Sequence, residues 1–261
     1  MKKIDPSTHP YELEIGRFLS SEQITSNSRN HCILDTLTNP TEPNVLPYLR
    51  LFNDPDFLSF GEVIACFKQL IEGLRVMYEN HNVMMDAATM YPDMWHPEVT
   101  NYKYDHSGRA KHYNRTERPP KHYYIDSGLS RKYDPNDGPP AELPILGGGK
   151  TVPEFQGDGY DKSADPFRTD IYYLCNLMRN TKYRGFDFMQ QLVADMVQAD
   201  PVKRPTIEEV ETRFDESPRR VSLEAPVKTG KEGRICPRAW DIIRTTKYLI
   251  KRLPPVPTPS S

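Results

Sequence analysis

An acidic side chain with metal-binding chemistry lies at the end of a short β-prone run in the middle of the chain. Asp126 follows Tyr123-Tyr124-Ile125 and precedes Ser127 and Gly128. A carboxylate at the end of a strand, followed by a glycine, can reach a metal ion that bridges phosphate groups. The alternative is an aspartate that only stabilises a turn. The chemistry that this position could support is therefore magnesium-assisted phosphate binding.

The cysteines and histidines show no spacing typical of a metal site or a disulfide framework. The four cysteines lie far apart without a C-x-x-C pair, and the seven histidines include no H-E-x-x-H. This pattern favours a reducing intracellular compartment, cytoplasmic or nuclear, over secretion. We expect His106, His112 and His122 to lie in a solvated polar loop.

The composition limits the class of protein further. The 261 residues carry 34 basic and 36 acidic side chains, a formal net charge of −2, which argues against a general nucleic-acid-binding protein. Hydrophobic residues make up 37% of the chain, enough for a core. No apolar run reaches the length of about 18 residues that a transmembrane helix needs. The 25 prolines should confine the helices to proline-poor windows.

Proline-poor windows with helical patterns lie mostly in the second half of the chain. The window from Phe60 to His81 has apolar residues at the three-four spacing of a buried stripe, and Ser59 with Glu62 resembles a capping box. Further helices are predicted at Tyr11–Leu19, Asp170–Arg179, Phe186–Gln198 and from Thr206, capped with Glu209, to about Phe214.

The remaining segments read as strands, loops and a tail. Strands are predicted at Cys32–Leu37, Val45–Leu49 and Tyr123–Ile125. Two long polar loops, Tyr91–Lys121 and Ser130–Thr151, are of the kind that is functional or disordered. After Glu216 the chain is rich in proline, serine and basic residues. Arg238–Leu253 could form a basic helix that touches an anionic membrane or a partner, or that packs back on its own domain.

Several strings together resemble protein kinase domains. The string 200–206, Asp-Pro-Val-Lys-Arg-Pro-Thr, resembles the "DPxxRPT" signature, and 125–130, Ile-Asp-Ser-Gly-Leu-Ser, resembles the "DFGLS" segment with Ser127 in place of Phe. Between them Val152-Pro153-Glu154 is similar to "APE", and Thr169-Asp170-Ile171-Tyr172 to the start of the central helix. The resemblance covers about residues 1–215. It is closest to divergent kinase-like proteins of mushroom-forming fungi, through His9-Pro10-Tyr11-Glu12, Asn30-His31-Cys32, Asn82–Ala87 and Met90-Tyr91-Pro92.

This resemblance implies a set of nucleotide-binding residues. Asp126 and Asn82 would bind Mg²⁺, and a Lys–Glu pair, best matched by Lys2 and Glu14, would hold ATP. Lys3 and Glu12 are the alternatives for that pair, and a solvated charge is the alternative for all of them. Asn82 could instead end a helix.

The resemblance also implies structural residues. Glu154 and Arg204 would form a buried ion pair, and Asp170 would begin the central helix and hold the catalytic-loop backbone.

Two kinase elements do not appear in the sequence. No G-x-G-x-x-G precedes Lys2, so we expect the phosphate loop to be absent. Residues 77–81 run directly into Asn82, without the H-R-D segment and its acceptor-orienting Asp, and no other aspartate lies between Asp56 and Asp86. Losing that group costs about 10²–10⁴-fold in rate. No catalytic residue can therefore be assigned.

The expected fold is α+β and kinase-like, with a reduced N-lobe at 1–52, a mainly helical C-lobe at 53–216 and a tail at 217–261. Three functions remain open: a catalytically impaired binding module for a protein partner, an active Ser/Thr kinase acting on a protein substrate whose recorded sequence lacks segments, and a nucleotide-binding regulator. In the tail, Arg219-Arg220-Val221-Ser222 resembles a phosphorylation site at Ser222, and the proline-rich end at 254–259 could bind an SH3- or WW-type groove or be inert.

Overall fold

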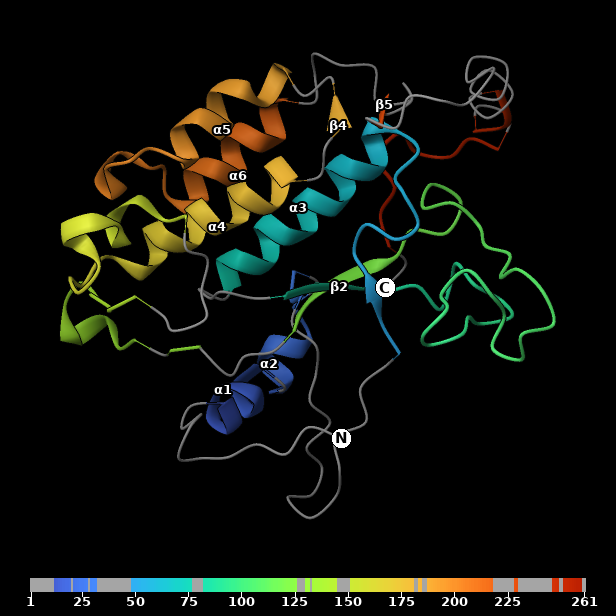
Figure 1. The fold of residues 1–261 in the computed structure, drawn as a ribbon, viewed down its shortest axis with the longest axis horizontal. Coiled ribbons are helices and arrows are strands. Elements are labelled where there is room, and N and C mark those ends of the chain that lie inside the picture. The colour runs from blue at the N-terminus through green and yellow to red at the C-terminus, as the bar shows by residue number, and fades with distance from the viewer. Residues whose placement is uncertain are drawn as a thin grey trace.

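The computed structural model describes the chain at 12–19, 21–27, 29–31, 48–76, 82–125, 130–131, 133–144, 151–180, 183–184, 187–217, 228–229, 246–248 and 251–259. Within these ranges the fold is α+β. Figure 1 shows helix α3 running between a cluster of helices on one side and a small sheet on the other. Among the described helices, none combines the length and the apolar character needed to cross a bilayer.

Helix α3 (Phe60–Val76) forms the centre of the core. Its apolar stripe is almost fully buried, as the three-four spacing predicts. At its start the Ser59 hydroxyl accepts from the Glu62 N–H (3.3 Å), but the Glu62 carboxylate accepts from the Leu58 N–H (2.7 Å). The capping box expected here is therefore only half formed, because the Glu62 side chain serves other partners.

Helices α4 (Pro166–Asn180), α5 (Gln190–Met196) and α6 (Ile207–Glu216) pack together with α3. They share one hydrophobic cluster with α3. Thr206 and Glu209 form a complete capping box at the start of α6, as expected from their spacing. Helix α4 begins four residues earlier than the predicted Asp170, because the Asp165 carboxylate accepts from the Phe167 N–H (2.9 Å) and so caps an earlier turn.

The main sheet has the order β1-β2-β3 and is antiparallel throughout. Its strands are β1 (Arg50–Leu51), β2 (Asn82–Asp86) and β3 (Lys121–Ile125). Residues 87–120 connect β2 to β3 and extend from that end of the hairpin (Figure 1). We call these residues the insert. A second, short pair joins β4 (Tyr183–Arg184) and β5 (Lys228–Thr229).

Both ends of the chain contribute to the core of α3. Helix α1 (Glu12–Leu19) buries Ile15 and Leu19 in the same cluster, followed by the short α2 (Glu22–Thr25), and Val256 packs on it from the tail. The helix predicted over the N-terminal residues 11–19 is therefore present. The strands predicted at 32–37 and 45–47 lie outside the described residues.

Two expectations about the insert and its neighbour were wrong. His122 is not in a solvated loop: it lies in β3 with 2% of its surface exposed, because the alternation of the strand turns it toward α3. The predicted polar loop at 91–121 has a core of its own. Tyr91 and Trp95 are buried with Met85, Ala87 and Met90 from the end of β2 and the turn after it.

Candidate functional site

The β2–β3 hairpin is fixed on α3 by side chains that pair its backbone. Gln69 accepts from the His122 N–H (2.9 Å), and the Tyr124 hydroxyl donates to the Leu70 carbonyl (2.7 Å). Gly73 makes this close approach feasible. A Cβ there would lie 2.8 Å from both the His31 Cβ and the Tyr124 ring.

The register of this hairpin sets the neighbourhood of two predicted magnesium ligands. Asn82 is the first residue of β2 and pairs with Ile125, the last residue of β3. Asp126 is the next residue after Ile125, so its backbone begins at the same end of the hairpin as Asn82. Asn82 is in a strand and does not end a helix. The Asn82 side chain and residues 126–129, including Ser127, lie outside the described part of the structure.

The predicted nucleotide pair is described only on the glutamate side. Glu14 lies on the exposed face of α1, since Ile15 and Leu19 occupy the buried face. Lys2 and Lys3 are outside the described residues, as is the side chain of Glu12. The pairing of Lys2 with Glu14 stays a prediction.

Glu154 and Arg204 meet in a buried, bidentate ion pair. The Arg204 Nη1 and Nη2 donate to Glu154 Oε1 and Oε2 at 2.7 and 2.5 Å, with 0% and 7% of the two side chains exposed. Arg204 also donates to the carbonyls of Gln198 (2.9 Å) and Arg168 (3.0 Å), and it lies 4.9 Å from the Tyr172 ring centroid. This guanidinium therefore connects three segments of the helical region: the turn at Glu154, helix α4, and the segment before α6.

Helix α4 carries two polar side chains near this pair in sequence. The Thr169 hydroxyl donates to Glu154 Oε1 (2.9 Å), which completes the hydrogen bonding of that carboxylate oxygen. Asp170 is 6% exposed in the second turn of α4. Its charge acts on Tyr133, whose pKa is raised by burial, by Glu142 and by Asp170. The residues that would connect Asp170 to a catalytic loop, 77–81, are outside the described ranges.

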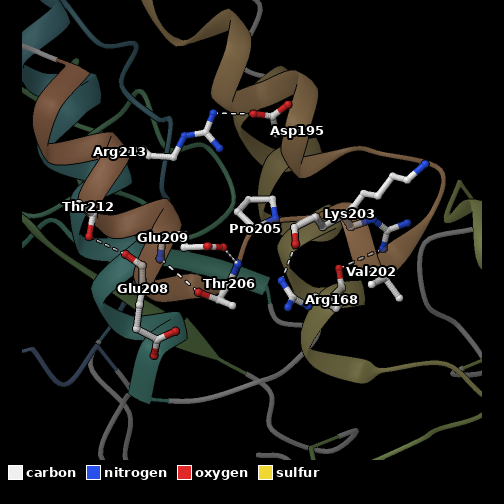
Figure 2. Close-up of a pocket in the computed structure, with 11 residues that line it drawn as sticks. Arg168, Asp195, Val202, Lys203, Pro205, Thr206, Glu208, Glu209, Thr212 and Arg213 are labelled. Carbon is white, nitrogen blue, oxygen red and sulfur yellow. Dashed lines mark hydrogen bonds and ion pairs between the residues drawn. The ribbon is translucent and has the colours of Figure 1, made fainter.

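An open hollow of about 630 Å³ lies beside this anchor, between α4, α5 and the start of α6 (Figure 2). Its charges are already paired with one another. Arg213 donates to Asp195 (2.5 Å), Glu209 accepts from the Thr206 N–H (2.8 Å), and Lys203 lies 3.8 Å from Asp200. The hollow therefore belongs to the scaffold around Arg204, with its polar groups used inside the protein.

Comparisons of the chain with protein-family models, with curated proteins and with solved structures find no match. The functional argument therefore depends on the motifs and on the geometry described above.

Nucleophilic cysteine chemistry and a preformed metal cluster find no support in the described residues. Cys66 and Cys175 are buried free thiols, and burial raises the pKa of each to about 12. Within the described ranges, no three His, Cys, Asp or Glu side chains come together as metal ligands. Cys32, Cys236 and Asp126 lie outside these ranges.

The tail and the insert contain contacts that the sequence did not reveal. Lys247 and Lys251 both reach Glu117 of the insert, at 2.6 and 3.0 Å, and Tyr248 between them is buried. The described part of the predicted basic helix thus packs back on its own chain. Ser222 lies outside the described residues. Two arginines of the insert region, Arg50 and Arg115, are buried, and no periodicity marks them as core positions.

Proposed function

We propose that the chain is a protein-kinase-like domain that binds Mg²⁺ and ATP with little or no phosphoryl transfer and acts as a binding module for a protein partner. The observation that carries this proposal is the register of the hairpin, in which Asn82 pairs with Ile125, the residue before Asp126. A magnesium site of this kind needs an amide oxygen and a carboxylate from neighbouring chain segments.

The helical region supports the kinase-like part of the proposal. The buried pair of Glu154 and Arg204 joins the two motifs that resemble "APE" and "DPxxRPT". The order of the central helix α3, the β2–β3 hairpin and helix α4 along the chain also agrees with the resemblance.

The connection between α3 and β2 supports the loss of activity. Helix α3 ends at Val76 and β2 begins at Asn82, and the residues between them, Met-Tyr-Glu-Asn-His, include no aspartate to orient an acceptor hydroxyl. In the proposed complex Asp126 and Asn82 hold the metal, and Lys2 with Glu14 orients the phosphates. The oxygen donors of Asn82 and Asp126 suit Mg²⁺ chemically.

Thermal unfolding with millimolar Mg²⁺–ATP tests nucleotide binding. We expect stabilisation, about 2.7 kcal/mol at one hundred times the Kd, that is lost in Asp126→Asn and kept in the matched loop variant Asp137→Asn. An unchanged melting curve in the unmodified protein would contradict the proposal.

Transfer of labelled γ-phosphate to a generic protein substrate tests the second half. We expect none above the level of the Asp126→Asn variant. Transfer that depends on Asp126 would instead favour the active kinase. The regular pairing of β2 from its first residue, directly after the missing segment, is the observation that favours that alternative. Sequencing the transcript across the codons of His81 and Asn82 distinguishes a genuine deletion from a lost segment.

A further inference from the structure

A second cavity, of about 330 Å³, lies at the base of the insert and apart from the hairpin end that carries Asn82. Three stretches of chain enclose it: the turn after β1, the turn after β2, and the loop at 100–112 of the insert. The lining side chains that matter for recognition are Asp54, Tyr91, Asn101, Tyr102, Arg109 and His112. Its volume is at the lower end of the range of small-molecule sites, about 300–1,000 Å³.

The loop that forms one wall is held by its own hydrogen bonds. The Ala110 N–H donates to the Asn101 carbonyl (2.9 Å), and the Lys103 N–H donates to the Gly108 carbonyl (2.9 Å). Tyr102 and Arg109 face each other as an isolated antiparallel bridge. This wall is therefore preformed, which lowers the entropic cost of binding a ligand.

The aromatic wall is fixed in orientation. The Tyr91 ring is 3% exposed and lies between the Arg50 guanidinium, 4.5 Å from its centroid, and the His112 ring, 5.0 Å from it at an interplanar angle of 34°. Tyr102 adds a second, partly exposed ring to the lining. Rings that are held in place favour a ligand with a flat apolar body.

The charge of the cavity is positive once the internal pairs are counted. The Asp54 carboxylate accepts from the Arg50 Nη2 (2.7 Å) and the Thr100 hydroxyl (3.2 Å), so its charge is neutralised inside the protein. The Arg109 guanidinium has no hydrogen bond, ion pair or ring contact to any residue in the described ranges, and the same holds for the Asn101 side-chain amide. Both side chains can therefore donate to a ligand.

We propose that this cavity binds a small carboxylate with a flat apolar body, such as an aromatic carboxylic acid. Arg109 donates two parallel N–H groups to the carboxylate, a geometry that its planar guanidinium matches. The ring of the ligand lies against Tyr91 and Tyr102. This site is independent of the proposed nucleotide site at Asn82 and Asp126.

Isothermal titration of the full chain with benzoate, benzamide and inorganic phosphate tests the proposal. We expect saturable binding of benzoate at millimolar concentration or below, and weaker binding of benzamide and phosphate. Arg109→Gln should weaken benzoate binding about ten-fold or more, because hydrogen bonds between charged groups are lost, and Arg109→Lys should weaken it less. Tyr102→Ala should weaken both benzoate and benzamide.

Lys111→Gln, an exposed charge of the same insert outside the cavity lining, is the matched control and should bind benzoate like the unmodified protein. The Arg109 variants should keep the melting temperature, since that guanidinium contacts no described residue. The proposal is overturned by the absence of saturable benzoate binding, by equal affinities for benzoate and phosphate, or by an Arg109→Gln variant that binds as tightly as Lys111→Gln.

Discussion

The helical region and the insert are stabilised by different kinds of side chain. Around α3, α4, α5 and α6 the core is apolar, and the backbone pairs within the helices themselves. The insert has mostly irregular backbone, so its N–H and C=O groups need partners from elsewhere. Buried charged side chains supply them. The comparison shows that a long loop can have a defined conformation without regular secondary structure.

Three charged residues make the insert's anchors. Glu62 of α3 is 1% exposed and accepts from the Thr116 N–H (3.0 Å) and the Thr116 hydroxyl (2.8 Å). Arg50 donates to the Thr100 carbonyl (2.9 Å). Arg115 of the insert reaches in the opposite direction, to the Pro55 carbonyl (2.7 Å), with its guanidinium 4.1 Å from the Phe57 ring centroid.

The largest effect should come from the one buried ion pair that both motifs of the helical region share. Arg204→Met leaves the Glu154 carboxylate buried without its cation, and we expect a loss of about 3–5 kcal/mol in the free energy of unfolding. Circular dichroism during urea unfolding measures it. Arg213→Met removes a pair of similar length to Asp195, with 37% and 26% of the two side chains exposed, and should cost about 0–1 kcal/mol. Equal losses in the two variants would contradict the role given to Arg204.

A smaller and more local effect is expected at the insert. Glu62→Gln keeps the size of the side chain but presents an NH₂ group where the carboxylate accepts backbone hydrogen bonds. We expect a loss of about 2–3 kcal/mol. Amide hydrogen exchange should show protection lost at Leu58 and Thr116. Glu208→Gln, on the exposed side of α6, is the control. If protection fell equally in α5 and α6, the insert would not be a separately anchored region.

The same contrast explains what the sequence could predict. The helical region has a period, so the stripe of α3 and the cap of α6 at Thr206 indicated real elements. The pairing of Glu154 with Arg204 was expected only through the kinase resemblance, because nothing in their spacing brings them together. The insert has no period, and buried arginines such as Arg50 and Arg115 look like surface charges in a sequence. His122 was misplaced for the same reason, since its burial depends on which face of β3 turns toward α3.

The smallest expected effect joins the insert to the tail. The Glu117 carboxylate accepts from Lys247 (2.6 Å), Lys251 (3.0 Å) and the Asn114 side chain (2.6 Å). Burial raises the pKa of Glu117, but the hydrogen bonds from the two lysines outweigh it, so the net pKa is lowered. A carboxylate with a lowered pKa stabilises the folded protein above the usual range of glutamate, and that stabilisation is lost as the pH falls through the folded pKa.

Glu117→Gln should therefore free the described tail from the insert at neutral pH, at a cost of about 1 kcal/mol or less, because both lysines are half exposed. The protection factors of the Lys251 and Leu253 amides, which donate to the Lys247 and Tyr248 carbonyls, should fall in the variant. In the unmodified protein they should fall as the pH drops below the usual range of glutamate, and in Glu117→Gln this pH dependence should disappear. Glu98→Gln, an exposed acid of the same insert, should keep it. If acid released the tail equally in Glu117→Gln, the contact would depend on the burial of Tyr248 and Val256, and the tail would resemble the helical region more than the insert.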